Sequence, residues 1–159
     1  MRVITVGVYG WTLETFLASL RNADVRLLMD VRQRRGVRGS EYAWANAKRL
    51  QAALDDAGIP YEHHPELAPT TELRELQYRV DDDAGVGKRS RSELSPEYAE
   101  RYTREILGQV DLRQLADGLP KDGAAALFCV ERDPEACHRS LIADRLARGL
   151  DISVEHVRP

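Results

Sequence analysis

Short apolar runs alternate along the chain with longer segments in which apolar residues recur at helical spacing. The short runs predict strands at residues 2–6, 26–31, 59–63, 124–130 and 152–156. Helices are predicted over 13–20, 45–57, 70–78, 112–119 and 134–148, and another begins at Ser95. This order favours an α/β fold: a small, mostly parallel sheet of about four to five strands flanked by helices, in a Rossmann-like three-layer arrangement.

Length and composition indicate one ordinary domain over residues 1–159. The chain has 31% charged residues and a formal net charge of -3, so no overall field indicates binding to nucleic acid or a membrane. It carries no N-terminal signal pattern and no apolar run approaching about 18 residues, so we expect a cytoplasmic protein without a membrane partner. The two cysteines do not form a disulfide framework, and thiols or metal ligands are the expected roles.

The most informative stretch is the predicted strand-to-helix turn from Phe128 to Arg139. It contains both cysteines, Cys129 and Cys137, together with Glu131 and His138. A helix beginning at Pro134 directs Arg139 toward the sheet, where a buried guanidinium needs a carboxylate, a cluster of carbonyls or an anionic ligand. A bound anion at the helix N-terminus would serve, and so would a local acid such as Glu131.

Several polar residues follow other predicted strands and share the level of Cys129. Because ligands of open parallel sheets bind beyond the carboxyl ends of the strands, we expect these residues to share one crevice. His63 and His64 are adjacent in extended chain, so at most one of them faces the crevice. The candidate substrate-binding residues are Gly7, Tyr9, Arg32, Arg139 and His63, and the candidate catalytic residues are Cys129, Glu131, His138 and Asp30.

Two polar loops carry clustered positive charge. Residues 33–40 hold three arginines on a glycine-broken backbone, which suits either phosphate contacts or a solvated loop. Residues 81–92 lack apolar periodicity and are either disordered or a mobile lid. The basic residues Lys88, Arg89 and Arg91 suit a lid that closes on an anion.

The motifs together are similar to those of the domain-of-unknown-function 488 family. They are Gly7, Asp30-Val31-Arg32, Gly58-Ile59-x-Tyr61 leading to Pro65-Glu66-Leu67, Cys129-x-Glu131, and Cys137-His138-Arg139. The resemblance covers nearly the whole chain and implies a compact α/β domain, and it implies no particular reaction. The chain departs from the family pattern at Val8-Tyr9-Gly10 and in the arginine-rich loop after Arg32, which affects the substrate-facing rim.

Three function classes remain open at this point. The first is an enzyme or ligand-binding protein for a small phosphorylated or other anionic substrate at the C-terminal edge of the sheet. The second is a zinc-type metal site made by Cys129, Cys137 and His138, with His63 or His64 as a further candidate ligand. Against it, the cysteines lack the short Cys-x-x-Cys spacing, and the phase of a helix beginning at Pro134 separates Cys137 from His138. The third is a nucleic-acid binding module that uses the arginine-rich loops. The phosphatase arrangement of a cysteine followed six positions later by arginine is excluded, because that position holds Glu135 after Cys129 and Ala143 after Cys137. No particular cofactor follows from these patterns.

Overall fold

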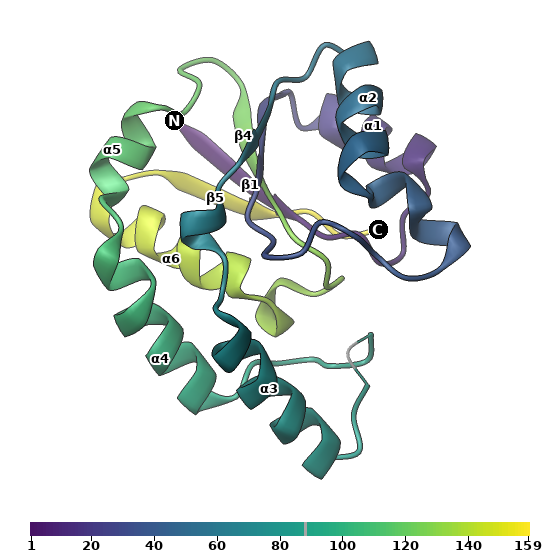
Figure 1. The fold of residues 1–159 in the computed structure, drawn as a ribbon. Coiled ribbons are helices and arrows are strands. Elements are labelled where there is room, and N and C mark those ends of the chain that lie inside the picture. Colours follow the sequence, from purple (N-terminus) through teal and green to yellow (C-terminus); the bar gives the residue numbers. More distant parts are fainter. Residues whose placement is uncertain (88) are drawn as a thin grey trace.

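A five-stranded sheet forms the centre of the protein (Figure 1). In the computed structural model, which describes residues 1–87 and 89–159, the strands follow the order β3-β2-β4-β1-β5 and every described pair is parallel. The strands are β1 (Arg2–Val6), β2 (Val25–Asp30), β3 (Tyr61–His63), β4 (Ala124–Phe128) and β5 (Ser153–His156). The predicted fold class is thereby confirmed.

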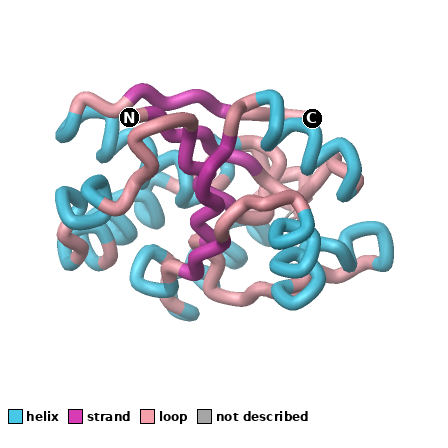
Figure 2. The backbone as a smooth tube through the Cα atoms, turned by 90° about the horizontal axis from the view of Figure 1, so that it is seen from above, coloured by secondary structure: helices cyan, strands magenta, loops and turns pink. Residues whose placement is uncertain are grey.

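Helices cover both faces of this sheet, as Figures 1 and 2 show. One face carries α1 (Leu13–Asn22) and α2 (Ala47–Asp56). The other carries α6 (His138–Leu150), with α4 (Pro96–Glu105) and α5 (Leu112–Asp117) packed against it. The remaining helix, α3 (Thr71–Asp83), packs on α4 near the end of the sheet. Among the described residues, no helix has the length and apolar character needed to cross a bilayer.

The core lies along β4, in the middle of the sheet. All five residues of this strand are buried. Phe16 of α1 packs on Phe128 from one face, with ring centroids 5.5 Å apart. Ile142, Ala143 and Leu146 of α6 are fully buried, as the helical spacing predicts. Apolar burial from both faces therefore fixes β4 and the turn that follows it.

The last helix begins later than its sequence signals indicate. Pro134–Ala136 form a separate 3-10 turn, Cys137 is extended with φ -138° and ψ 143°, and α6 starts at His138. The Ala136 carbonyl, which a continuous helix would use internally, accepts hydrogen bonds from the Arg91 side chain instead. The predicted helix start at Pro134 is therefore wrong. Its end also differs from the predicted residue 148, because α6 continues to Leu150 and the left-handed residue that follows it is Asp151.

The helix predicted over residues 70–78 also continues further, to Asp83. Gln77 donates to the Asp81 carboxylate at 2.8 Å, and Arg91 pairs with the same carboxylate at 2.7 Å. These contacts hold the last turn of α3 in place, so the first three residues of the segment 81–92 are helical. Arg91 is buried, whereas Lys88 lies outside the described residues. The role of this segment as a lid stays a prediction.

The topology places a crevice at the carboxyl end of β4. The chain leaves β1 and β2 toward α1 and α2 on one face, whereas it leaves β4 toward α6 on the opposite face. Neighbouring strands whose connections diverge in this way leave a crevice between them, where ligands of α/β sheets bind. The residues that follow these three strands include Gly7, Arg32 and Cys129.

Candidate functional site

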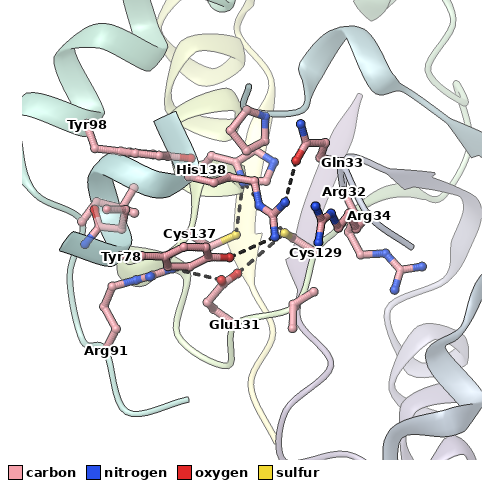
Figure 3. Close-up of a pocket in the computed structure, with 15 residues that line it drawn as sticks. Arg32, Gln33, Arg34, Tyr78, Arg91, Tyr98, Cys129, Glu131, Cys137 and His138 are labelled. Atoms are coloured by element: carbon pink, nitrogen blue, oxygen red, sulfur yellow. Dashed lines mark hydrogen bonds and ion pairs between the residues drawn. The ribbon is translucent and has the colours of Figure 1, made fainter. Parts of the chain in front are cut away.

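Two thiols and one imidazole meet at the end of β4 (Figure 3). Cys129 follows the strand directly, Cys137 precedes α6, and His138 is the first residue of that helix. The His138 Nδ1 atom lies 3.9 Å from the Cys129 sulfur and 3.7 Å from the Cys137 sulfur. All three ligand atoms lie within 4.8 Å of one another and all three residues are buried, which brings together the predicted Cys/Cys/His group.

The orientation of the imidazole is set by a backbone carbonyl. His138 Nε2 lies 2.8 Å from the carbonyl oxygen of Val31, at the end of β2. A carbonyl oxygen only accepts hydrogen bonds, so Nε2 carries the hydrogen. In the neutral ring, Nδ1 then presents its lone pair to the two sulfurs.

Without a metal, the two thiols differ in acidity. Burial opposes a charge on Cys137, but a hydrogen bond with Cys129 and the nearby charges of His138 and Arg139 lower the pKa of Cys137 well below its ordinary value. The same hydrogen bond, together with burial, raises the pKa of Cys129. Burial likewise opposes a charge on His138, but the Cys137 thiolate raises the pKa of this histidine. Cys137 is therefore the thiol that ionises more readily.

Glu131 connects this group to the segment before α4. Its carboxylate lies 3.7 Å from the Cys129 sulfur through Oε2 and 3.0 Å from the Arg91 guanidinium through Oε1. Arg91 also binds Asp81 and the Ala136 carbonyl, so a single guanidinium joins α3 to the turn after β4. Glu131 is buried beside a cation, in a position to exchange a proton with a bound group.

Asp30, the last residue of β2, forms a buried ion pair with Arg32. The Arg32 guanidinium donates to both Asp30 oxygens, at 2.9 Å and 2.8 Å, and to the Ala45 carbonyl. The Tyr61 hydroxyl donates to the same carboxylate at 2.6 Å. His63 Nε2 lies 3.0 Å from the Arg32 carbonyl oxygen. Of Asp30, Arg32 and His63, only Arg32 lines the cavity that contains the Cys/Cys/His group, and Asp30 neutralises its charge.

Two other predicted residues shape the backbone of the turn. The Arg139 guanidinium is fully buried and donates to the carbonyls of Glu131 and Arg132, at 2.6 Å and 3.0 Å. Its inward direction is confirmed, and of the partners considered from the sequence the structure shows backbone carbonyls. Gly7 packs so closely on this turn that a Cβ would lie 1.9 Å from the Glu131 oxygen. Both residues therefore hold the loop that carries Cys129 and Glu131.

The pocket consists of two adjoining chambers. The inner chamber has a volume of about 60 Å³ and contains the Cys/Cys/His group and Glu131. The outer chamber has a volume of about 660 Å³ and is lined by Tyr9 and four arginines. Residues Arg34, Arg74, Tyr78 and Val130 line both chambers. A substrate could thus place a small group at the thiols and its remaining atoms among the arginines.

The positive charge at the junction comes from residues outside the predicted site set. Arg74 donates to Gln33 Oε1 at 2.6 Å and to the Tyr78 hydroxyl at 3.0 Å. Arg34, which belongs to the predicted arginine-rich loop, is exposed and also lines both chambers. Arg74 and Tyr78 are four positions apart in a predicted helix, and this spacing is the signal that could have placed both on one face.

Tyr9 lies in the outer chamber. The Arg89 guanidinium lies 5.0 Å from the centre of the Tyr9 ring and 5.3 Å from the centre of the Tyr42 ring. Arg89 also pairs with Glu41 and donates to the Arg38 carbonyl, which brings the two predicted basic loops together. Tyr9 is therefore part of the rim and not of the inner chamber.

Comparison with known proteins gives one match. No curated protein and no solved structure matches the chain. The family model described as Domain of unknown function DUF488 matches residues 12–146, a range that includes the Cys/Cys/His group and both arginines at the chamber junction. The chain therefore belongs to the DUF488 family.

Proposed function

We propose that this protein is an enzyme that acts on a small phosphorylated or otherwise anionic substrate at the C-terminal edge of the sheet. The observation that carries the proposal is the junction of the two chambers, where Arg34 and Arg74 adjoin the chamber that holds Cys129, Cys137 and His138. Guanidinium groups bind phosphate and carboxylate in a planar, bidentate manner. The anionic group of the substrate is thus held beside the reactive side chains.

The size of the inner chamber supports a small reacting group. Its volume of about 60 Å³ corresponds to roughly two water molecules. The outer chamber is within the usual size range of small-molecule sites. In this proposal Glu131 exchanges protons with the substrate, and the Cys/Cys/His group supplies either a cysteine thiolate with His138 as its proton acceptor or a set of metal ligands. Asp30 acts through Arg32 as a positioning residue.

Titration calorimetry with inorganic phosphate tests the anion site. Arg74→Gln and Arg34→Gln should each weaken phosphate binding by about tenfold, because each removes a charge-assisted hydrogen-bonding group. Arg79→Gln is the matched control, since Arg79 is exposed on the same helix and lines neither chamber. Equal phosphate affinity in Arg74→Gln, Arg34→Gln and the wild-type protein would refute the site.

Nucleic-acid binding is the second candidate, favoured by the contact between the two basic loops at Arg89. The outer chamber offers arginines beside tyrosine rings, the combination that binds single strands. A labelled oligothymidylate should then bind with an affinity that falls steeply with salt, by a slope of about 0.7 per phosphate contact on logarithmic axes. A flat salt dependence, or the absence of binding, would remove this candidate and leave the small-substrate proposal intact.

A further inference from the structure

We infer that Cys129, Cys137 and His138 bind one zinc-type divalent metal ion, and that one coordination position of this ion faces the inner chamber. The ligands are the two thiolate sulfurs and the Nδ1 atom of the imidazole. This inference deepens the proposed function, on which its catalytic role rests. It identifies what the Cys/Cys/His group holds.

The distances between the ligand atoms fit tetrahedral coordination. Zinc bonds of about 2.3 Å to sulfur and about 2.0 Å to nitrogen place a sulfur and a nitrogen roughly 3.5 Å apart at a tetrahedral angle. The two sulfur-to-Nδ1 distances are 3.7 Å and 3.9 Å, for Cys137 and Cys129 respectively. Small side-chain shifts therefore suffice to close the three ligands on one ion.

The hydrogen bond from His138 to Val31 is an independent indication. A histidine that binds a metal through one nitrogen commonly donates the other N–H to a carbonyl or carboxylate, which fixes the ring and its tautomer. His138 has this arrangement, with Nε2 2.8 Å from the Val31 oxygen. The free lone pair of Nδ1 is consequently aimed at the two sulfurs.

The observed start of α6 removes one objection to a metal site, namely that the helical phase separates Cys137 from His138. A helix beginning at Pro134 would separate Cys137 from His138 by its turn. Because Cys137 is extended and α6 begins at His138, the two side chains converge instead. Zinc sites with three protein ligands and an open fourth position are the catalytic type. The inner chamber, which all three ligands line, provides the space for that position.

The charges around the site are also compatible with a divalent ion. Two thiolates offset its charge, so the bound group is close to neutral. Glu131 is paired with Arg91, and the arginines at the junction remain available to an anionic substrate. Metal binding and anion binding therefore use different side chains and can be measured separately.

The test is metal content and cobalt spectroscopy of the full chain. The protein is purified with a phosphine reductant and without chelator, and native mass spectrometry compares it with a denatured sample. We expect one zinc per chain that is lost on denaturation. After exchange with Co²⁺, we expect a thiolate-to-cobalt charge-transfer band in the near ultraviolet and intense visible bands typical of a tetrahedral site.

Variants assign the ligands. Cys137→Ser and His138→Gln should each lower Co²⁺ affinity at least tenfold and change the visible bands, with folding checked by circular dichroism. His64→Gln is the control for surface binding, because His64 lies between two carboxylates outside this site and its loss should leave the bands unchanged. The wild-type measurement decides the question even if a ligand variant fails to fold.

Two results would overturn the inference. One is a folded wild-type protein that takes up less than a tenth of an equivalent of Zn²⁺ or Co²⁺ under reducing conditions. The other is a cobalt spectrum that is the same in His138→Gln as in the wild type. Arg74-dependent phosphate binding by a protein that takes up no metal would refute the metal site and leave the anion site standing, whereas metal binding without any phosphate affinity would refute only the anion site.

Discussion

At the level of single residues, Gly7 determines how closely β1 approaches the turn that bears Cys129. The backbone N–H groups of Val8 and Tyr9 both donate to the Val130 carbonyl, at 2.9 Å and 3.2 Å. A methyl group at Gly7 would collide with the neighbouring Glu131 carbonyl. The glycine is thus needed for space between two backbones, and not for an unusual backbone angle.

Gly7→Ala should therefore destabilise the protein by about 1–3 kcal/mol, the range typical of overpacking in a close-packed interior. Urea unfolding followed by circular dichroism measures the change. Gly149→Ala serves as the control, because Gly149 lies in α6 and a methyl group there would meet no neighbouring atom within 4 Å. That change should stabilise the helix by about 0.5–1 kcal/mol. Destabilisation by both substitutions would contradict the steric explanation.

A second residue-level prediction concerns the buried ion pair of Asp30 and Arg32. Asp30→Asn leaves the Arg32 charge buried without its partner and should cost about 3–5 kcal/mol of unfolding free energy. Tyr61→Phe removes one hydrogen bond to the same carboxylate and a longer one from the half-buried Arg35, leaves the ion pair in place, and should cost less, about 1.5–3 kcal/mol. Chemical denaturation of both variants checks this order, and a larger loss in Tyr61→Phe would contradict it.

The sequence is enough to predict which types of residue gather at the site. It predicts the contact partners of those residues less well. Cys129, Glu131 and His138 are adjacent to a predicted strand end, and local spacing is enough to bring them together. Arg32 and Arg139 are less predictable, because their partners are a carboxylate two positions away and backbone carbonyls of the turn. Arg74 contributes from a helix more than 50 residues before Cys129, a contact that only tertiary packing creates.

At the level of elements, the segment between α3 and α4 depends on one side chain. Arg91 binds Asp81, Glu131 and the Ala136 carbonyl, and Leu94 donates its N–H to the Glu135 carbonyl. These contacts connect the segment to the turn after β4. They also explain why α6 begins at His138, a boundary that the local signals at Pro134 could not reveal.

Arg91→Met should loosen this segment. We expect the amides of Val86 and Leu94 to exchange hydrogen at least about tenfold faster, because local opening no longer breaks an ion pair. Hydrogen exchange detected by mass spectrometry measures the effect. Arg89→Met is the matched control, since Arg89 is an exposed arginine of the same segment and makes its contacts at the rim. Equal acceleration throughout β4 would mean global destabilisation instead.

Most elements are predictable from the sequence because apolar periodicity follows the layers. The strands at 2–6 and 124–128 coincide with buried runs, and Thr12 caps α1 as its position before the helix indicates. The errors fall at ends where a distant side chain decides, because Arg91 binds Asp81 in the last turn of α3 and the Ala136 carbonyl just before α6.

At the level of the whole molecule, one histidine at the edge of the sheet should make the stability of the protein depend on pH. His156 of β5 lies 2.8 Å from the Thr5 hydroxyl through Nδ1. Burial lowers the pKa of His156, and the Arg139 and Arg158 charges act in the same direction. The unfolded chain therefore takes up this proton at a higher pH than the folded protein does.

The folded protein should lose stability through this group as the pH falls below about 6.5, the ordinary pKa of histidine. His156→Gln should reduce that loss. Unfolding free energies of both proteins from pH 8 to pH 5 test the prediction. Their difference should be constant above about pH 7.5 and should change in favour of the variant at lower pH. A constant difference over the whole range would show that the proton of His156 has no part in acid stability.

The Cys/Cys/His group and the junction arginines come from separate parts of the chain. The thiols and imidazole come from ten consecutive residues after β4, whereas the junction arginines come from the loop after β2 and from α3. Under the proposed function, changes in the loop and in α3 would alter which molecule is selected while the reactive group and its supporting hydrogen bonds stay intact. Relatives with this architecture could diverge in substrate preference and still share one kind of chemistry.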